Sequence, residues 1–391
     1  MNEPSEQLQL DLRRSVQDSL AKRRPILHHL NSDTSWFLQI PRPDSAVRHG
    51  SRLYYNILID PWFNGPQTDL SWWFSLQYHV VPSAVQSIAD LEDLAREIEV
   101  LASELRPQHG RRSNGYSQDE KDAPGTLIDA VAISHEFTDH CHEETLLQVN
   151  KDVPIFTTKE AAALIGSWNH FRTIVTIPVF GKGLDTDWRS TSIPPLPDWI
   201  GISRLLQSQD VIALHSALMI AFNNQHHNRV AKLAKPEPFT SGKRKRHEAI
   251  APSEDEDYGE AVIHTPHGIS ADDLAAIVPS ADPPICTLAL LHGLHDVKVG
   301  ESRFGTTLQI NLGAGNGLRA QRATEAKYWF GTHDEVKKGS GIIAWMLKTK
   351  MTTLRGALDV EMRKGKLSNE DAAHVLSVFE ELKSGESRVL V

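Results

Sequence analysis

The stretch His135-Glu-Phe-Thr-Asp139-His140 combines the residue types that bind divalent metal ions. Imidazole nitrogens and carboxylate oxygens are ligands of zinc and similar ions. The apolar run at 127–133 comes directly before this stretch and predicts a buried strand that ends in a loop. Ligands on such a loop are held by a rigid sheet and still face a cleft. The same residues also suit a simpler interpretation, in which Asp139 caps the next helix and His135 is an ordinary polar residue at a strand end.

Further histidines stand beside other apolar runs. His333 follows the run that ends at Phe330, His215 begins an apolar run, and His267 lies in Thr-Pro-His-Gly268. Ligands converge at strand ends in α/β folds, so these positions predict side chains that approach the 135–140 stretch. One such histidine is usually structural, but their recurrence favours a shared metal site.

Two other segments could line the same cleft. The loop His292-Gly-Leu-His-Asp296 follows a predicted strand, and its polar groups either face the cleft or cap the strand end. The glycine-rich run at 311–317 lacks the Lys-Ser/Thr pair of a phosphate-binding P-loop. We therefore expect a tight turn there, which brings backbone close to the cleft.

Predicted strands and helices alternate along the chain, which indicates an α/β protein with largely buried sheets. We expect a polar N-terminal lead-in over residues 1–30 and one domain over 31–340. That domain has a predicted loop insertion at 106–125 and a predicted disordered insertion at 223–258, where blocks of opposite charge follow one another. Residues 341–391 are predicted to form a helical tail that packs on the domain.

The composition narrows the function classes. A formal net charge of −9 argues against nucleic acid as a partner. Only two cysteines occur, Cys141 and Cys286, which excludes a disulfide framework and predicts a cytoplasmic protein. The basic run Lys243-Arg-Lys-Arg246 suits a nuclear-import signal, although a solvated charge run is the more frequent explanation. No run of 18 apolar residues is present, so no transmembrane segment is expected.

The order of these residues resembles the ordered motifs of the metallo-β-lactamase superfamily. The shared order is Asp60, His135-x-x-x-Asp139-His140, His215, His267 and His333. The segments 288–293 and 326–334 are similar to the lactonase-like and phospholipase-D-like branch of that superfamily. The resemblance extends over residues 36–340 and implies a four-layer αββα sandwich.

The resemblance also implies a ligand set, with two departures from the family pattern. His135 and His215 correspond to ligands of the family's first metal, together with a histidine that is Phe137 here. Asp139, His140 and His333 correspond to the ligands of the second metal. The family's bridging aspartate is replaced near His267, so one ion is expected, at Asp139, His140 and His333.

Roles for the remaining residues follow from the same resemblance. Asp139 is expected to take part in catalysis, together with His135 and His267, which would orient water or stabilise an oxyanion. We expect four further residues to orient the ligands from outside, because metal-binding histidines usually need such partners. They are Asp60, His292, His295 and Asp334.

The expected function is that of a metal-dependent hydrolase. Zinc, manganese or iron suits the ligand set. The expected reaction is cleavage of an ester, lactone or phosphodiester bond in a small molecule or lipid by metal-bound hydroxide. The alternative is a binding protein that keeps the fold and has lost turnover, which the phenylalanine at position 137 favours. The sequence gives no indication of the oligomeric state.

Overall fold

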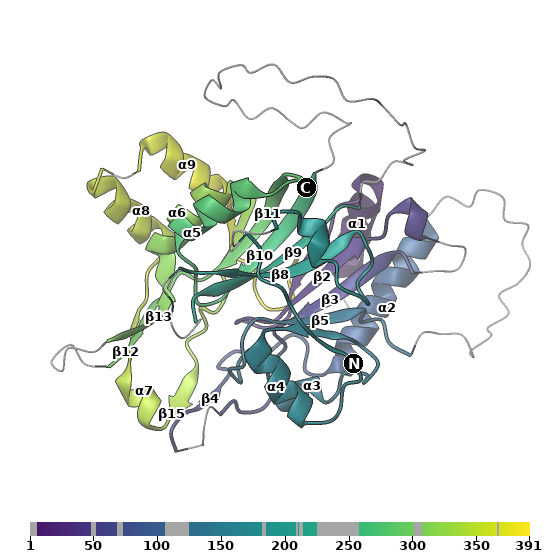
Figure 1. Ribbon diagram of the computed structural model, residues 1–391, viewed down its shortest axis with the longest axis horizontal. Coiled ribbons are helices and arrows are strands. Elements are labelled where there is room, and N and C mark those ends of the chain that lie inside the picture. Colours follow the sequence, from purple (N-terminus) through teal and green to yellow (C-terminus); the bar gives the residue numbers. More distant parts are fainter. Residues whose placement is uncertain are drawn as a thin grey trace, which may run out of the picture.

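Two large β-sheets lie face to face in the computed structural model of the chain, with helices on both outer sides (Figure 1). The structure describes residues 6–47, 52–68, 73–105, 125–181, 185–208, 210, 214–224, 258–300, 307–365 and 367–391. None of the helices within these ranges is both long and apolar enough to cross a membrane.

The first sheet has the strand order β18-β1-β2-β3-β5-β6-β7 among the described residues. Its strands β3, β5, β6 and β7 run parallel, whereas β1, β2 and β18 pair antiparallel to their neighbours. The strands are β1 (Ile26–His29), β2 (Trp36–Pro41), β3 (Tyr54–Ile59), β5 (Ala130–Ile133), β6 (Ile155–Thr157), β7 (Ile174–Thr176) and β18 (Ser387–Val389).

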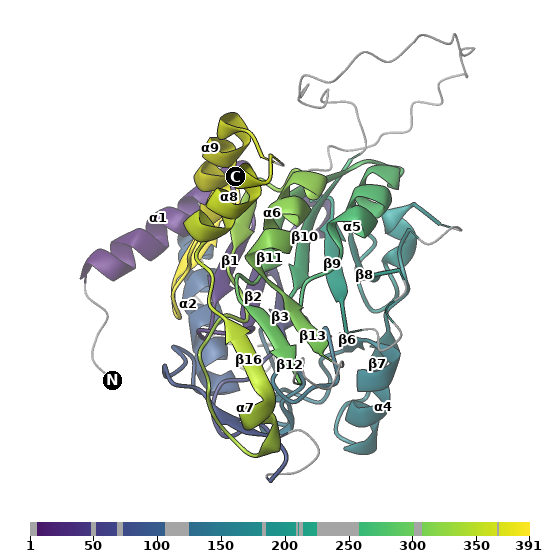
Figure 2. The same ribbon diagram turned by 90° about the vertical axis from the view of Figure 1, so that its left-hand side faces the viewer.

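The second sheet has the order β17-β14-β11-β10-β9-β8 in the described part of the chain. Its strands are β8 (Ile200–Leu206), β9 (Ser216–Phe222), β10 (Gly259–Thr265), β11 (Ile285–His292), β14 (Tyr328–Phe330) and β17 (Phe379–Glu380). Two small sheets are separate from the large ones: β13-β12-β16, visible side by side in Figure 2, and β15-β4. They consist of β4 (Leu76–Tyr78), β12 (Asp296–Val299), β13 (Leu308–Leu312), β15 (Lys338–Ser340) and β16 (Leu347–Lys350).

The helices complete two outer layers. They are α1 (Glu6–Lys22), α2 (Ile88–Leu105), α3 (Glu143–Leu146), α4 (Lys159–Ser167), α5 (Ala271–Ile277), α6 (Gly313–Thr324), α7 (Ile342–Met346), α8 (Leu354–Arg363) and α9 (Asn369–Val378). Buried residues of α2 and α4 pack on the outer face of the first sheet. Those of α5 and α6 pack on the outer face of the second sheet. This arrangement confirms the predicted four-layer αββα sandwich.

Strand residues alternate between the layers, as the two-residue period of a β-strand requires. In β3, Ile57 and Ile59 pack in the core between the two sheets, while Leu58 faces the helical layer with α2. In β10, Val262 faces the other sheet and Ile263 faces the α5 layer. Both sheets therefore bury both faces, which explains why their strands are almost uniformly apolar.

The C-terminal segment belongs to both sheets. Residues 341–391 were expected to form a helical tail, and α8 and α9 do pack beside α6 in one apolar cluster. The segment also contributes β17, which pairs with β14, and β18, which pairs with β1. At its N-terminal end, the chain forms α1, whose Val16 packs with Ile98 of α2 and Tyr54 of β3.

The predicted insertions fall on residues that the structure does not describe, apart from their ends. Residues 106–124 and 225–257, including the basic run at 243–246, lie outside the described ranges. The second segment joins β9 to β10, which are antiparallel neighbours with Phe222 opposite Glu260. The Asn223 side chain also donates a hydrogen bond to the Tyr258 carbonyl oxygen, at 3.0 Å. The two ends of the segment are thus already adjacent.

Replacing residues 227–256 by a four-residue Gly-Asn turn is therefore expected to leave the protein folded. A shorter connection costs less closure entropy, so the free energy of unfolding should stay constant or rise by about 1–2 kcal/mol. Thermal and urea unfolding of the shortened and full-length chains measure this difference. A clearly lower midpoint for the shortened chain would show that the segment contributes packing of its own.

Candidate metal centre

Strand ends from both sheets meet at one edge of the sandwich, and each leads into a polar residue. β3 ends just before Asp60, β5 leads to His135, β10 leads to His267, and β14 leads to His333. β2 runs antiparallel to β3, so the β1–β2 loop with Asp33 reaches the same edge. Asp60 and His333 have positive φ angles of 42° and 58°, a conformation that non-glycine residues seldom adopt.

The imidazole ring of His140 lies at the centre of these residues. Its ring centroid is 5.4 Å from that of His135, 5.0 Å from that of His267 and 5.2 Å from that of His333. The Asp139 carboxylate lies beside them, with Oδ1 3.6 Å from His140 Nε2 and Oδ2 3.7 Å from His333 Nε2. The ligand atoms form two overlapping groups, His135–His140–His267 and Asp139–His140–His333, each with its atoms within 4.8 Å of one another. His140 belongs to both groups.

Two of the histidines present a free ring nitrogen to this centre. His140 Nδ1 lies 2.9 Å from Asp60 Oδ2, and His267 Nδ1 lies 2.9 Å from Asn311 Oδ1. Both oxygens accept hydrogen bonds, so each Nδ1 donates, and Nε2 carries a lone pair whenever the ring is neutral. Both Nε2 atoms are buried and have no hydrogen-bond partner among the described residues. Buried unsatisfied acceptors of this kind fit metal ligation, in which an outer oxygen holds the other ring nitrogen.

His333 is oriented in the same way by Asp33. His333 Nδ1 lies 3.1 Å from Asp33 Oδ1, and the His333 backbone N–H donates to the Asp33 carbonyl oxygen at 3.0 Å. The Nε2 atom of His333 is thereby directed toward Asp139. His140, His267 and His333 thus share one arrangement, with Nδ1 bonded to a protein oxygen and Nε2 turned to the centre.

The carboxylate of Asp60 organises the inner side of the centre. Asp60 is fully buried and accepts hydrogen bonds from the Ser134 backbone N–H at 2.7 Å, the Ser134 hydroxyl, His140 Nδ1 and His264 Nε2, the last at 2.9 Å. Burial alone would raise the pKa of Asp60, but its interactions with His140 and His264 outweigh burial and hold the pKa well below its usual range. Asp60 therefore carries a negative charge and fixes the His140 ring, the orienting role that the sequence suggested for it.

The pKa values of two histidines of the centre, His140 and His267, are shifted in opposite directions. Burial would lower the pKa of His140, but the carboxylates of Asp139 and Asp60 outweigh it and raise the pKa. Burial lowers the pKa of His267 well below its usual range, and the neighbouring His135 and His140 lower it further. His267 is therefore neutral at neutral pH and can act as a ligand without losing a proton.

His135 directs its Nε2 to a carbonyl oxygen of the protein. Its Nε2 lies 2.8 Å from the Leu214 carbonyl oxygen, which can only accept, and its Nδ1 lies 3.0 Å from the Ser134 hydroxyl oxygen. Burial lowers the pKa of His135 to about 3. Phe137 stacks on the His135 ring with the centroids 6.0 Å apart. The group that contains His135 therefore has fewer available donors than the group around Asp139.

Lys337 places a positive charge at the outer side of the centre. Its Nζ lies 2.7 Å from Asp33 Oδ2 and 2.9 Å from Asp139 Oδ2. Burial would lower the pKa of Lys337, but the two carboxylates outweigh it and raise the pKa. For Asp139, the charge of Lys337, followed by those of His140 and His333, outweighs the effect of burial and holds the pKa well below its usual range.

No family model and no curated protein matches the sequence. One similar solved structure is an isothiocyanate hydrolase from Delia radicum gut bacteria, with 14% identity and a TM-score of 0.46; the match covers 93% of this chain and 99% of that one. A second is a possible metal-dependent hydrolase from Veillonella parvula, with 12% identity, a TM-score of 0.47 and coverage of 94% of this chain and 100% of that one. A third is the metallo-β-lactamase fold protein YhfI from Bacillus subtilis, with 11% identity, a TM-score of 0.38 and coverage of 93% of this chain and 99% of that one. The four-layer αββα arrangement is the one that the sequence resemblance to the metallo-β-lactamase superfamily implied. The four layers and the ordered motif residues at one sheet edge carry this statement, because identities this low concern the fold alone.

One residue of the metallo-β-lactamase motif order, His215, lies outside both ligand groups. It was expected to be a metal ligand, but its Nδ1 lies 3.4 Å from Asp210 Oδ2 and its backbone N–H also donates to that carboxylate, at 2.5 Å. The segment 214–216 contributes to the centre in another way, because the Leu214 carbonyl oxygen accepts the hydrogen bond from His135.

His292, His295 and Asp334 contact the 292–296 loop and its neighbours rather than the proposed metal ligands. His292 Nδ1 lies 2.7 Å from the Gly293 carbonyl oxygen, and its Nε2 lies 3.0 Å from the Asn316 side chain. Asp334 accepts hydrogen bonds from the backbone N–H groups of Leu294 and His295, each at 2.8 Å from Oδ1. His295 Nδ1 is 3.7 Å from the same Asp334 oxygen. These contacts tie the loop to the end of β14, which corrects the expectation that His292, His295 and Asp334 orient the metal ligands.

Four residues of the centre were not singled out in the sequence: Asp33, His264, Asn311 and Lys337. Asp33 lies in the run Asn-Ser-Asp-Thr-Ser35, which is typical of a turn, and Lys337 is one of two adjacent lysines. His264 lies within an apolar strand, and its polar side chain in that apolar run is the only sequence signal that could have marked it. Nothing in the local sequence at Asn311 or Lys337 distinguishes an inward from an outward side chain.

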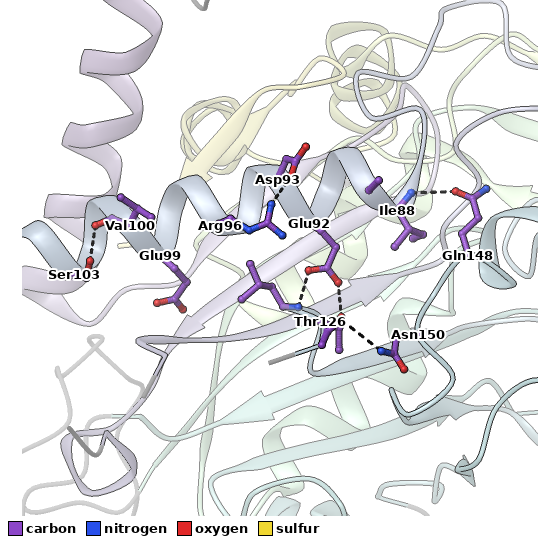
Figure 3. A pocket seen from close by; sticks show the side chains of 13 residues that line it. Ile88, Glu92, Asp93, Arg96, Glu99, Val100, Ser103, Thr126, Gln148 and Asn150 are labelled. Carbon is purple, nitrogen blue, oxygen red and sulfur yellow. Dashed lines mark hydrogen bonds and ion pairs between the residues drawn. The ribbon is translucent and has the colours of Figure 1, made fainter. Parts of the chain in front are cut away.

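A separate pocket of about 730 Å³ runs along the outer face of α2 (Figure 3). Polar groups at one end of it hold α2 to the neighbouring loops. Glu92 accepts hydrogen bonds from the Leu127 backbone N–H at 2.6 Å and from the Thr126 hydroxyl, and Ile88 N–H donates to Gln148. Its lining residues in the described ranges include neither histidine nor cysteine. The histidine centre, rather than this pocket, has the residue types for chemistry.

Proposed function

We propose that this chain is a metal-dependent hydrolase that binds one divalent ion through His140, His267, His333 and Asp139. The observation that carries the proposal is the pair of buried Nε2 atoms of His140 and His267, which lack hydrogen-bond partners among the described residues while both Nδ1 atoms are held by oxygen acceptors. Three imidazoles and one carboxylate suit zinc, manganese or iron. A divalent ion in such a site polarises a carbonyl or phosphoryl group and lowers the pKa of water toward 7.

The residues around the proposed ligands hold the three imidazole rings in fixed orientations. Asp60, Asn311 and Asp33 fix the rings of His140, His267 and His333 through their Nδ1 atoms. The raised pKa of His140 means that binding of the ion competes with a proton at this ring. Metal affinity should therefore fall as the pH is lowered.

The proposed reaction is hydrolysis of an ester, lactone or phosphodiester bond in a small molecule or lipid-derived compound. This choice rests on the sequence resemblance of the 288–293 and 326–334 segments to the lactonase-like and phospholipase-D-like branch. His135, neutral at neutral pH and hydrogen-bonded to Leu214, is positioned to donate through Nε2 rather than to bind the ion. It would then contribute to water or oxyanion positioning only if that bond to Leu214 is exchanged.

A second candidate function is binding without turnover. Phe137 at a ligand position and the hydrogen bond of His135 Nε2 to Leu214 favour it, since both remove donors that a two-metal hydrolase would use.

Elemental analysis of protein purified without chelator tests the proposal. We expect close to one zinc, manganese or iron per chain, and loss of ester or phosphodiester hydrolysis when that ion is removed by chelation. Protein that holds no metal and takes none up during titration would overturn the hydrolase proposal in favour of binding without turnover. Two ions per chain would contradict the one-ion site.

A further inference from the structure

The ammonium group of Lys337 lies between two carboxylates at the edge of the ligand group Asp139–His140–His333. Its Nζ is 2.7 Å from Asp33 Oδ2, 2.9 Å from Asp139 Oδ2 and 3.5 Å from His333 Nδ1. The side chains of Lys337 and Asp139 are each 11% exposed, and that of Asp33 is fully buried. This is a built ion-pair network rather than a surface contact.

Two carboxylates buried this close together require a cation, because their mutual repulsion and desolvation are otherwise costly. In a site with two metal ions, the second ion meets this need. Here the described residues meet it with a covalently attached ammonium, which cannot dissociate. A second divalent ion next to it would face both charge repulsion and the loss of the two oxygens that Lys337 already uses.

We propose that Lys337 takes the place of a second metal cation and thereby limits the centre to one ion. This inference rests on the proposed function. Asp139 divides its two oxygens accordingly: Oδ2 is bound to Lys337, while Oδ1, 3.6 Å from His140 Nε2, remains for the single ion. Lys337 is thus a positioning residue, which acts on the ion through Asp139.

Contacts of the chain before and after Lys337, and one with Trp62, hold its side chain in this position. Two residues before it, Glu335 accepts hydrogen bonds from the backbone N–H groups of Val80 and Val81, at 2.8 and 3.0 Å. Immediately after it, β15 pairs with β4, with Lys338 opposite Tyr78. The Lys337 ammonium also lies 5.2 Å from the centroid of the Trp62 ring, a cation–π distance. The chain before and after Lys337 is anchored, so its side chain has little freedom to leave the site.

Counting bound ions in a charge-removing variant tests this inference. Lys337→Met keeps an unbranched apolar side chain that is one heavy atom shorter and removes the ammonium. Wild-type protein and the variant are dialysed against excess zinc, freed of unbound zinc and analysed for zinc per chain. We expect one ion in the wild type and close to two in Lys337→Met. Lys338→Met is the matched control, because Lys338 is the next residue and exposed, and it should bind one ion.

The outcomes separate this inference from the proposed function. One ion in both the wild type and Lys337→Met would overturn the role of Lys337 and leave the one-ion hydrolase intact. Two ions in the wild type would overturn the role of Lys337, because the lysine would then not exclude the second ion. No ion in any of the proteins would overturn the proposed function and this inference with it. Should Lys337→Met fail to fold, Lys337→Gln removes the charge while keeping a donor for one carboxylate, and it too should bind a second ion.

Discussion

Replacing Asp60 with alanine is expected to lower the free energy of unfolding by about 3–5 kcal/mol, the range found when one partner of a buried charged pair is removed. The fully buried Asp60 carboxylate accepts hydrogen bonds from His140, His264 and both donors of Ser134. Alanine leaves these buried donors without an acceptor, and each unmet donor is costly. Urea unfolding of metal-free wild-type and variant protein measures the difference.

Asp60→Asn is the matched control for the charge. The amide has the same shape and keeps one acceptor oxygen. We therefore expect its free energy of unfolding to lie between those of the wild type and the alanine variant. The pKa of Asp60 is held below its unfolded value, so the stability that its charge contributes is present above about pH 4 and is lost as the pH falls. An alanine variant within about 1 kcal/mol of the wild type, below the usual cost of one unmet buried donor, would show that Asp60 does not organise the centre.

Replacing His140 with alanine is expected to abolish metal binding. His140 belongs to both groups of candidate ligands, and its buried Nε2 has no hydrogen-bond partner among the described residues. Its loss removes a ligand whichever group holds the ion. Elemental analysis of the purified variant, supported by zinc titration, should show well below one ion per chain.

His142→Ala provides the control for the loss of a buried histidine from the same loop. His142 is buried, but its Nδ1 lies 2.9 Å from the Thr145 hydroxyl and its Nε2 lies 3.2 Å from the Pro66 carbonyl oxygen. This variant should keep the metal content of the wild type. If His140→Ala also kept it, the ion would have to lie elsewhere and the assignment of the centre would fail.

The position of the centre could be predicted because it depends on local patterns. Apolar runs such as 127–133 predict strands from their composition, and the residues just after them must lie at a sheet edge. Parallel strands bring these edges together, so His135, His267 and His333 could be expected to converge before any contact was known. The order of these residues along the chain then pointed to the four-layer sandwich.

The partners of these residues could not be predicted in the same way. Asp33 and His333 are 300 positions apart, and Asp139 and Lys337 are 198 apart. Their contact requires the β1–β2 loop and the segment after β14 to meet, which depends on the packing of whole sheets. The same limit explains the mistaken expectations at His292 and His295, since a loop histidine turns toward whichever neighbour accepts its hydrogen bond.

The sequence by itself determined the strands, their apolar faces and the metal-binding residue types at the strand ends, because each of these follows from residue identity and near neighbours. Only the tertiary structure decided that His215 lies outside the ligand groups, that His135 Nε2 is hydrogen-bonded to the Leu214 carbonyl oxygen and that Lys337 lies between Asp33 and Asp139. The physical reason is that the direction of a side chain in a loop, and the charge beside it, are determined by groups distant in sequence that only the packed sheets bring within hydrogen-bond distance.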